Sequence, residues 1–134
     1  MGVMIDDVDD PWLVLGSGGT LQPPTGVLDV GASGTTARFL TAAAALVPGP
    51  VTIDGTPRMR ERPIGALAAA LSSMGAEIDT QAGFPPVRIS GGRLSGGTVG
   101  VDMSVSSQFA SAVLEDSLRE RGLERGPHRG PQFQ

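Results

Sequence analysis

Three arginines alternate in the segment GTPRMRERPIG, residues 55–65. On an exposed strand end, Arg58, Arg60 and Arg62 would repel one another unless an anion lay among them. Arg62 also directly precedes Pro63, a residue suited to the first turn of a helix, where a cation is electrostatically unfavourable. A bound anion would resolve both conflicts, so the segment predicts an anion site. The alternative is a solvated run of charge balanced by the neighbouring glutamate.

Two further segments could bind anions. DVGASGTTARF (residues 29–39) and DMSVSSQFA (residues 102–110) each lead from an expected strand into an expected helix. The start of a helix presents unpaired N–H groups and partial positive charge, which suit a phosphate or a carboxylate. Gly31 and Gly34 would let the backbone approach a ligand closely. The hydroxyl donors of the two segments are Thr35, Ser106 and Ser107. Simple N-capping by serine or threonine is the alternative for each segment.

The composition excludes several classes of function. All ten basic residues are arginine, and the net charge of −4 argues against nucleic acid as a partner. The chain has no cysteine, and His128 is its single histidine, which leaves almost no material for a zinc centre, so neither metal nor cofactor is predicted. No apolar stretch is long enough to cross a membrane, and the acidic first ten residues do not resemble a signal peptide. A cytoplasmic location is the default expectation.

The elements that position these segments recur along the chain. At an offset of 73 positions, residues 1–41 overlay residues 74–114 without a gap, with 13 identities among the 41 pairs. Glycines, aspartates and serines match in one register, which a shared apolar pattern alone does not produce. The overlay predicts two copies of one structural unit.

Hydrophobic spacing and turn residues predict the elements of this unit. Ile64, Leu67, Leu71 and Met74 recur at helical spacing, and Gly75 suits the left-handed position that ends a helix. A Gly-Phe-Pro-Pro turn is expected between the two strands that follow. The expected elements, in order, are strands 3–7, 12–16 and 26–30, helix 33–47, strand 51–55, helix 63–74, strands 76–80, 86–90 and 98–105, and a helix from Ser106.

This order predicts an α/β or α+β fold with helices packed on one face of a sheet. Residues 1–114 form the expected domain, with both copies of the unit incomplete. Residues 115–134 are charged and rich in glycine and proline. This tail is interpreted either as the solvated end of a helix or as foreign sequence from a frameshift or a gene break, and the second interpretation is favoured.

Three segments together resemble a known family. DVGASGTTARFL, GTPRMRERPIGALAAAL and SVSSQFASA are similar, in order and spacing, to signature segments of 3-phosphoshikimate 1-carboxyvinyltransferase, also called EPSP synthase. The resemblance implies transfer of the enolpyruvyl group of phosphoenolpyruvate to the 5-hydroxyl of shikimate 3-phosphate, without a metal. It also implies repeated βαβαββ units, here as part of a single domain, and agrees with the 73-residue repeat.

The resemblance also implies which residues bind the substrates. Gly34 and Arg62 match positions that bind phosphoenolpyruvate, whereas Thr35 and Arg38 lie in the same motif with less direct roles. The positions that match the shikimate 3-phosphate site are Ser106, Ser107 and Gln108, and the last also reaches phosphoenolpyruvate. The anion beside Arg62 is then phosphoenolpyruvate, with Arg58 and Arg60 as its solvated neighbours.

The sequence departs from the family in ways that bear on activity. Ala32 stands where the family usually has asparagine, and the lysine-containing segment and the second domain of the family have no counterpart. The catalytic residues are therefore unknown, and we expect the chain alone to be inactive. Two alternatives stay open: a relative of UDP-N-acetylglucosamine enolpyruvyl transferase, and a non-catalytic, anion-binding product of a broken gene.

Overall fold

The computed structural model describes residues 2–6, 13–17, 20–92 and 94–95. The second expected strand-to-helix junction lies outside these residues, and with it Ser106, Ser107, Gln108 and the tail 115–134. The division into a domain of residues 1–114 and a separate tail therefore stays a prediction.

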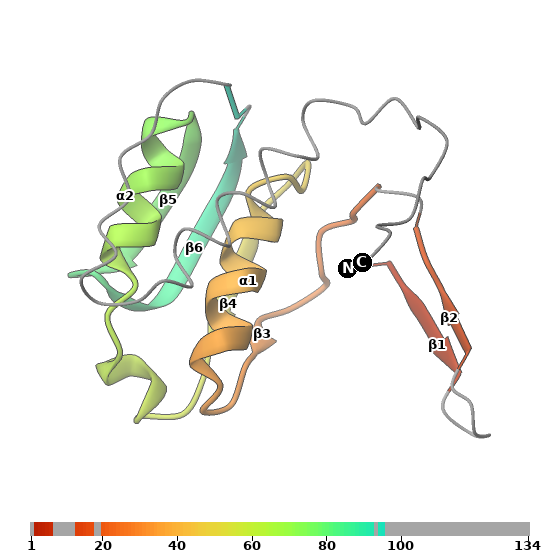
Figure 1. The fold of residues 1–134 in the computed structure, drawn as a ribbon, viewed down its shortest axis with the longest axis horizontal. Helices are drawn as coiled ribbons and strands as arrows, with labels where there is room; N and C mark the ends of the chain where they lie inside the picture. The colour runs from red at the N-terminus through yellow and green to blue at the C-terminus, as the bar shows by residue number, and fades with distance from the viewer. Residues whose placement is uncertain (1, 7–12, 18–19, 93, 96–134) are drawn as a thin grey trace, which may run out of the picture.

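A four-stranded sheet forms the centre of the described structure, with strand order β3-β4-β6-β5 (Figure 1). Its strands are β3 (Leu28–Asp29), β4 (Val51–Asp54), β5 (Ala76–Gln81) and β6 (Phe84–Gly92). β3 and β4 run parallel, because helix α1 (Gly34–Ala44) connects them, whereas β6 is antiparallel to both of its neighbours. Helix α2 (Gly65–Ser73) leads from β4 to β5. The chain from β3 to β6 is thus one βαβαββ unit, which confirms the predicted α/β fold.

Both helices cover the same face of the sheet (Figure 1). In β4, Val51 and Ile53 are buried while the alternate residues are only half-buried, as expected for a sheet packed on one side. The four positions that predicted α2 are all in the core, each at most 4% exposed: Ile64, Leu67, Leu71 and Met74. Their burial confirms the helical spacing read from the sequence.

Local sequence sets the ends of the helices. Ser33 caps α1, because its Oγ accepts a hydrogen bond from the Thr36 N–H at 3.2 Å. α1 ends at Ala44, three residues before the predicted end, and tight turns continue to Val47. Gly75 follows Met74, the C-cap residue of α2, and has a φ of +105°, which confirms its predicted left-handed conformation.

The turn between β5 and β6 differs from the prediction. Ala82 and Gly83 form it, with φ values of +54° and +88°, as a two-residue hairpin turn requires. Pro85 and Pro86 of the predicted turn instead lie within β6. They fit there because β4 pairs with β6 only from Val87 onward, and the pairing with β5 is irregular at this point, so the missing N–H groups break no ladder.

Strands β1 (Met4–Asp6) and β2 (Leu13–Leu15) form a separate antiparallel hairpin. The 73-residue offset maps these strands onto β5 and β6, which also pair antiparallel. The registers differ by two residues: Ile5 pairs with Val14, whereas Ile78 pairs with Ile89. A shift of two keeps every side chain on its own face. The duplication itself stays a prediction, because most of the second copy lies outside the described residues.

Candidate anion-binding site

The carboxyl ends of the parallel strands β3 and β4 meet at one edge of the sheet. In an open α/β sheet, ligands bind outside this edge. Here the loop from β3 enters α1, and the loop from β4 enters a short 3-10 helix, η1 (Met59–Glu61). The loops are joined because the Thr56 N–H donates to the Gly31 carbonyl oxygen at 2.9 Å. The Val30 N–H likewise donates to the Asp54 carbonyl oxygen at 2.9 Å.

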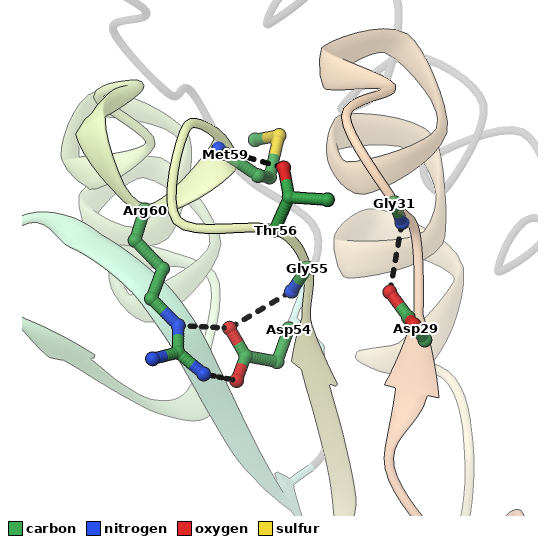
Figure 2. A network of polar contacts seen from close by, with 7 residues as sticks. All are labelled: Asp29, Gly31, Asp54, Gly55, Thr56, Met59 and Arg60. Carbon is green, nitrogen blue, oxygen red and sulfur yellow. Dashed lines mark hydrogen bonds and ion pairs between the residues drawn. The ribbon is translucent and has the colours of Figure 1, made fainter.

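Each of the two strands ends in an aspartate that shapes the loop after it (Figure 2). Asp29 and Asp54 lie opposite each other in the register of β3 and β4. The Asp29 carboxylate accepts the Gly31 N–H at 2.8 Å, and the Asp54 carboxylate accepts the Gly55 N–H at 2.8 Å. A β-carbon on Gly55 would collide with the Gly31 carbonyl oxygen, so only glycine fits where the loops touch.

The three alternating arginines do not lie on a strand end, so that expectation was wrong. Arg58 directly precedes η1, Arg60 lies within it, and Arg62 follows it. A 3-10 helix has about three residues per turn, so residues two apart point in different directions. Met59, only 2% exposed, anchors the turn in the core, and its carbonyl oxygen accepts the Arg62 N–H at 3.0 Å. The three guanidinium groups are thus separated instead of crowded.

Arg62 reaches the first residue of α1. A β-carbon built on Gly34 would lie 2.9 Å from Arg62 Nη1 and 3.4 Å from Arg38 Nη1. Arg38 shares this face of α1 because it lies one turn after Gly34. Two guanidinium groups, supplied by different elements, therefore approach the same helix N-terminus. The absence of a side chain at Gly34 is what gives them the space.

The electrostatics of this cluster favour an anion. Burial lowers the pKa of the Arg38 guanidinium, and the neighbouring positive charge of Arg62 lowers it further. The helix N-terminus adds partial positive charge at the same place. Among the described residues, no carboxylate forms an ion pair with Arg62. A phosphate or carboxylate bound beside Gly34 would offset the repulsion and accept charge-assisted hydrogen bonds.

The helix N-terminus that Arg62 approaches is that of α1, whereas the sequence predicted an anion at the helix that follows Pro63. α2 begins at Gly65, two residues later than expected. Its first N–H groups, those of Ile64 and Gly65, donate to the Gly83 carbonyl oxygen at 2.9 and 3.0 Å. The hairpin turn between β5 and β6 therefore caps α2 from within the protein, and two N–H groups at this helix start are already paired.

Arg60 is exposed, as expected of a solvated residue, but its side chain also pairs with a carboxylate. Its guanidinium binds both carboxylate oxygens of Asp54, with Nε at 2.9 Å from Oδ1 and Nη2 at 2.5 Å from Oδ2 (Figure 2). Hydrogen bonds from Arg60 and from the Gly55 N–H lower the pKa of the Asp54 carboxyl. Arg58 is exposed, as expected.

The structure brings together three of the predicted site residues: Gly34, Arg38 and Arg62. Thr35 is exposed in the first turn of α1, beside Gly34. Sequence reasoning missed Asp54, although a signal was present, because aspartates end both parallel strands and a glycine closely follows each one. Within the described ranges, no group of three or more histidine, cysteine or acidic side chains could hold a metal ion. No described helix is long and apolar enough to cross a membrane.

Comparisons with known proteins identify the family that this chain resembles. A family model described as EPSP synthase (3-phosphoshikimate 1-carboxyvinyltransferase) matches residues 1–115. Relatives named 3-phosphoshikimate 1-carboxyvinyltransferase occur in Rhizobium leguminosarum bv. trifolii and in Pseudomonas syringae pv. tomato, each 47% identical over 115 residues. These alignments cover 85% of this chain but 27% and 28% of the relatives.

A solved structure of EPSP synthase from Acinetobacter baumannii has a similar fold. It superposes with a TM-score of 0.79 at 32% sequence identity. The match covers 88% of this chain and 27% of that one. The chain thus spans little more than a quarter of the length of the proteins that it resembles.

Proposed function

The chain belongs to the EPSP synthase family, and on that basis we propose that it supplies part of the substrate site of a 3-phosphoshikimate 1-carboxyvinyltransferase. Such an enzyme moves the enolpyruvyl group of phosphoenolpyruvate to the 5-hydroxyl of shikimate 3-phosphate. The names of the relatives favour this function over the alternative of a UDP-N-acetylglucosamine enolpyruvyl transferase.

One observation carries the proposal: Arg62 and Arg38 approach Gly34 at the N-terminus of α1. Phosphoenolpyruvate carries a phosphate and a carboxylate, and both groups match the planar fork of a guanidinium. In the proposed complex, Arg62 binds this substrate and Gly34 leaves room for it. Arg38 and Thr35 border the same space.

The remaining predicted site residues concern the second substrate. We assign shikimate 3-phosphate to Ser106, Ser107 and Gln108, which lie outside the described residues. The chemical step also needs groups that transfer protons at the reacting carbons. No described residue of the site is suited to that task, because arginine stays protonated and the threonine hydroxyl is a weak acid. The proposed role of this chain is therefore to bind and orient, without a metal or a cofactor.

The proposal includes a cytoplasmic location and excludes nucleic acid and membranes as partners. Its support is chemical: both substrates are polyanions, which do not cross a bilayer unaided, and the net charge of −4 is unsuited to nucleic acid.

The test is a titration of the purified chain with phosphoenolpyruvate, followed by NMR chemical shifts and by thermal unfolding. We expect weak binding, in the millimolar range that corresponds to about 4 kcal/mol, with the largest shifts at Gly34 and Thr35. Arg62→Gln should abolish binding, whereas Arg58→Gln, at an exposed position on the same turn, should leave it intact. Equal affinity in wild type and Arg62→Gln would refute the proposal.

A further inference from the structure

We propose that Asp54 is a positioning residue that, through Arg60, holds the turn after β4 so that Arg62 points at the N-terminus of α1. This inference rests on the proposed function, because it concerns the same anion site. Asp54 itself does not touch that site. Its carboxylate is directed toward Arg60 and the Gly55 N–H (Figure 2).

Besides the Ile64 N–H bond to the Gly83 carbonyl oxygen beyond Arg62, three contacts attach the turn to the rest of the protein. The Thr56 N–H donates to Gly31 of the neighbouring loop at 2.9 Å, and the Met59 side chain is buried in the core. These two contacts fix the start and the middle of the turn. The third is the bidentate pair between Asp54 and Arg60, which fixes the direction that the turn takes toward Arg62.

The geometry of the turn links this third contact to the direction of Arg62. Arg60 and Arg62 are two residues apart, so their side chains leave the turn in different directions. With Arg60 held against the strand end, Arg62, which follows η1 in an extended conformation, points toward Gly34. A rotation of the turn that released Arg60 would move Arg62 away from α1. A bidentate arginine–carboxylate pair resists such rotation better than a single hydrogen bond does.

The ion pair between Asp54 and Arg60 also neutralises negative charge at the edge of the site. Without Arg60, the Asp54 carboxylate would be an unpaired negative charge at the end of β4, next to the loop that leads to the anion. The positive charge of Arg60 balances the Asp54 carboxylate, so the pair holds the turn in place without adding net negative charge. This explains why a carboxylate can lie so close to a site for anions.

The affinity of four variants for phosphoenolpyruvate tests the inference. We expect Asp54→Asn and Arg60→Gln to weaken binding about fivefold, the ratio that an exposed charge pair can account for. Arg60→Lys keeps the charge but loses the bidentate geometry, so its affinity should lie between those of Arg60→Gln and the wild type. The double variant should bind no worse than either single one, because the two residues act as a unit. Arg58→Gln is the matched control and should bind as the wild type does.

A measurement without ligand separates positioning from general stability. In the folded wild-type chain, nuclear Overhauser effects should connect the Arg62 δ-protons with the Gly34 α-protons, because Arg62 Cδ lies 3.6 Å from the β-carbon position of Gly34. These effects should weaken in Asp54→Asn and in Arg60→Gln at a temperature where both variants are fully folded. A structural role alone would leave them unchanged in the folded molecules.

The outcomes distinguish this inference from the proposed function. If Arg62→Gln loses binding while Asp54→Asn and Arg60→Gln bind as the wild type does, the positioning role is wrong and the proposed function stands. Unchanged nuclear Overhauser effects between Arg62 and Gly34 in Asp54→Asn and Arg60→Gln would also refute the positioning role. Wild-type affinity in Arg62→Gln would refute the proposed function and this inference together.

Discussion

Arg62 Nη1 lies 2.9 Å from the point where a β-carbon on Gly34 would stand, so an alanine at position 34 and the present position of Arg62 exclude each other. The atom in the way is the end of a flexible side chain, so Gly34→Ala should displace the guanidinium without unfolding the chain. We expect affinity for phosphoenolpyruvate to fall about tenfold, the loss of roughly one charge-assisted hydrogen bond. Titration followed by NMR measures this.

Gly26→Ala is the control for this substitution, because nothing lies within 4 Å of a β-carbon at Gly26. Both variants should unfold within a few degrees of the wild type. If Gly34→Ala kept full affinity, the position of Arg62 beside α1 would not matter for binding.

Arg62→Gln should not destabilise the free chain. Arg38 has a lowered pKa in the folded state, in part because of Arg62, so protonated Arg38 is less favourable there than in the unfolded chain. Removing the second charge relieves this repulsion at neutral pH. We expect urea denaturation to give an unfolding free energy that equals the wild-type value within about 0.5 kcal/mol or exceeds it.

Inorganic phosphate should stabilise the wild type but not Arg62→Gln, because a ligand that binds only the folded state raises its stability. A contrary result would be a loss of about 2 kcal/mol or more of unfolding free energy in Arg62→Gln without ligand, which is typical of removing a buried interaction. It would show that Arg62 stabilises the fold and is not reserved for binding an anion.

Gly55→Ala should destabilise the chain by about 1–3 kcal/mol, the usual cost of overpacking. Its β-carbon would meet the Gly31 carbonyl oxygen and lie 3.0 Å from the Met59 β-carbon, and neither backbone nor buried side chain can yield easily. The urea midpoint should fall with an unchanged m-value. Gly16→Ala, into open space, should have almost no effect. Similar midpoints for the two variants would contradict the close contact between the loops.

The contribution of Asp54 to stability should depend on pH. Arg60 and the Gly55 N–H lower the pKa of its carboxyl in the folded state below the ordinary value of 3.8. The stabilisation is therefore complete above that ordinary value and is lost as the pH falls through the lower, folded-state pKa. Melting temperatures of wild type and Asp54→Asn should differ at pH 7 and converge in acid. Asp79→Asn, at an exposed position on β5, is the control, and a difference that persisted in strong acid would argue against the ion pair.

The purified chain alone should show no transferase activity. The family's lysines have no counterpart here, because all ten basic residues are arginine, and the chain spans 27% of the Rhizobium relative. Phosphate release from both substrates should stay at background, with Arg62→Ala indistinguishable from wild type. Robust turnover that Arg62→Ala abolished would identify a minimal enzyme. It would also exclude the hypothesis of a non-catalytic, broken gene product.

Within the described residues, the sequence predicted the order of the strands and α-helices, but not the 3-10 helix η1. The spacing of Leu67 and Leu71 predicted a helix and its buried side, and Gly75 predicted where the helix ends. These features depend on neighbours within a few residues, because hydrophobic periodicity and backbone preference are local properties. The same holds for Ser33, whose capping bond to Thr36 lies within one helical turn. The family resemblance added Gly34 and Arg62 as site residues.

Which helix N-terminus Arg62 approaches depends on contacts between segments that are far apart in the sequence. Arg62 is close to α2 in sequence, yet the Gly83 carbonyl oxygen, brought there by the hairpin between β5 and β6, already accepts the first N–H groups of α2. Arg62 instead meets α1, because the parallel pairing of β3 and β4 places the loops after both strands at one edge of the sheet. The pair of Asp54 and Arg60 depends likewise on the 3-10 turn between them. Local sequence cannot predict such contacts, since strand pairing and loop packing, which act over long separations in the chain, select them.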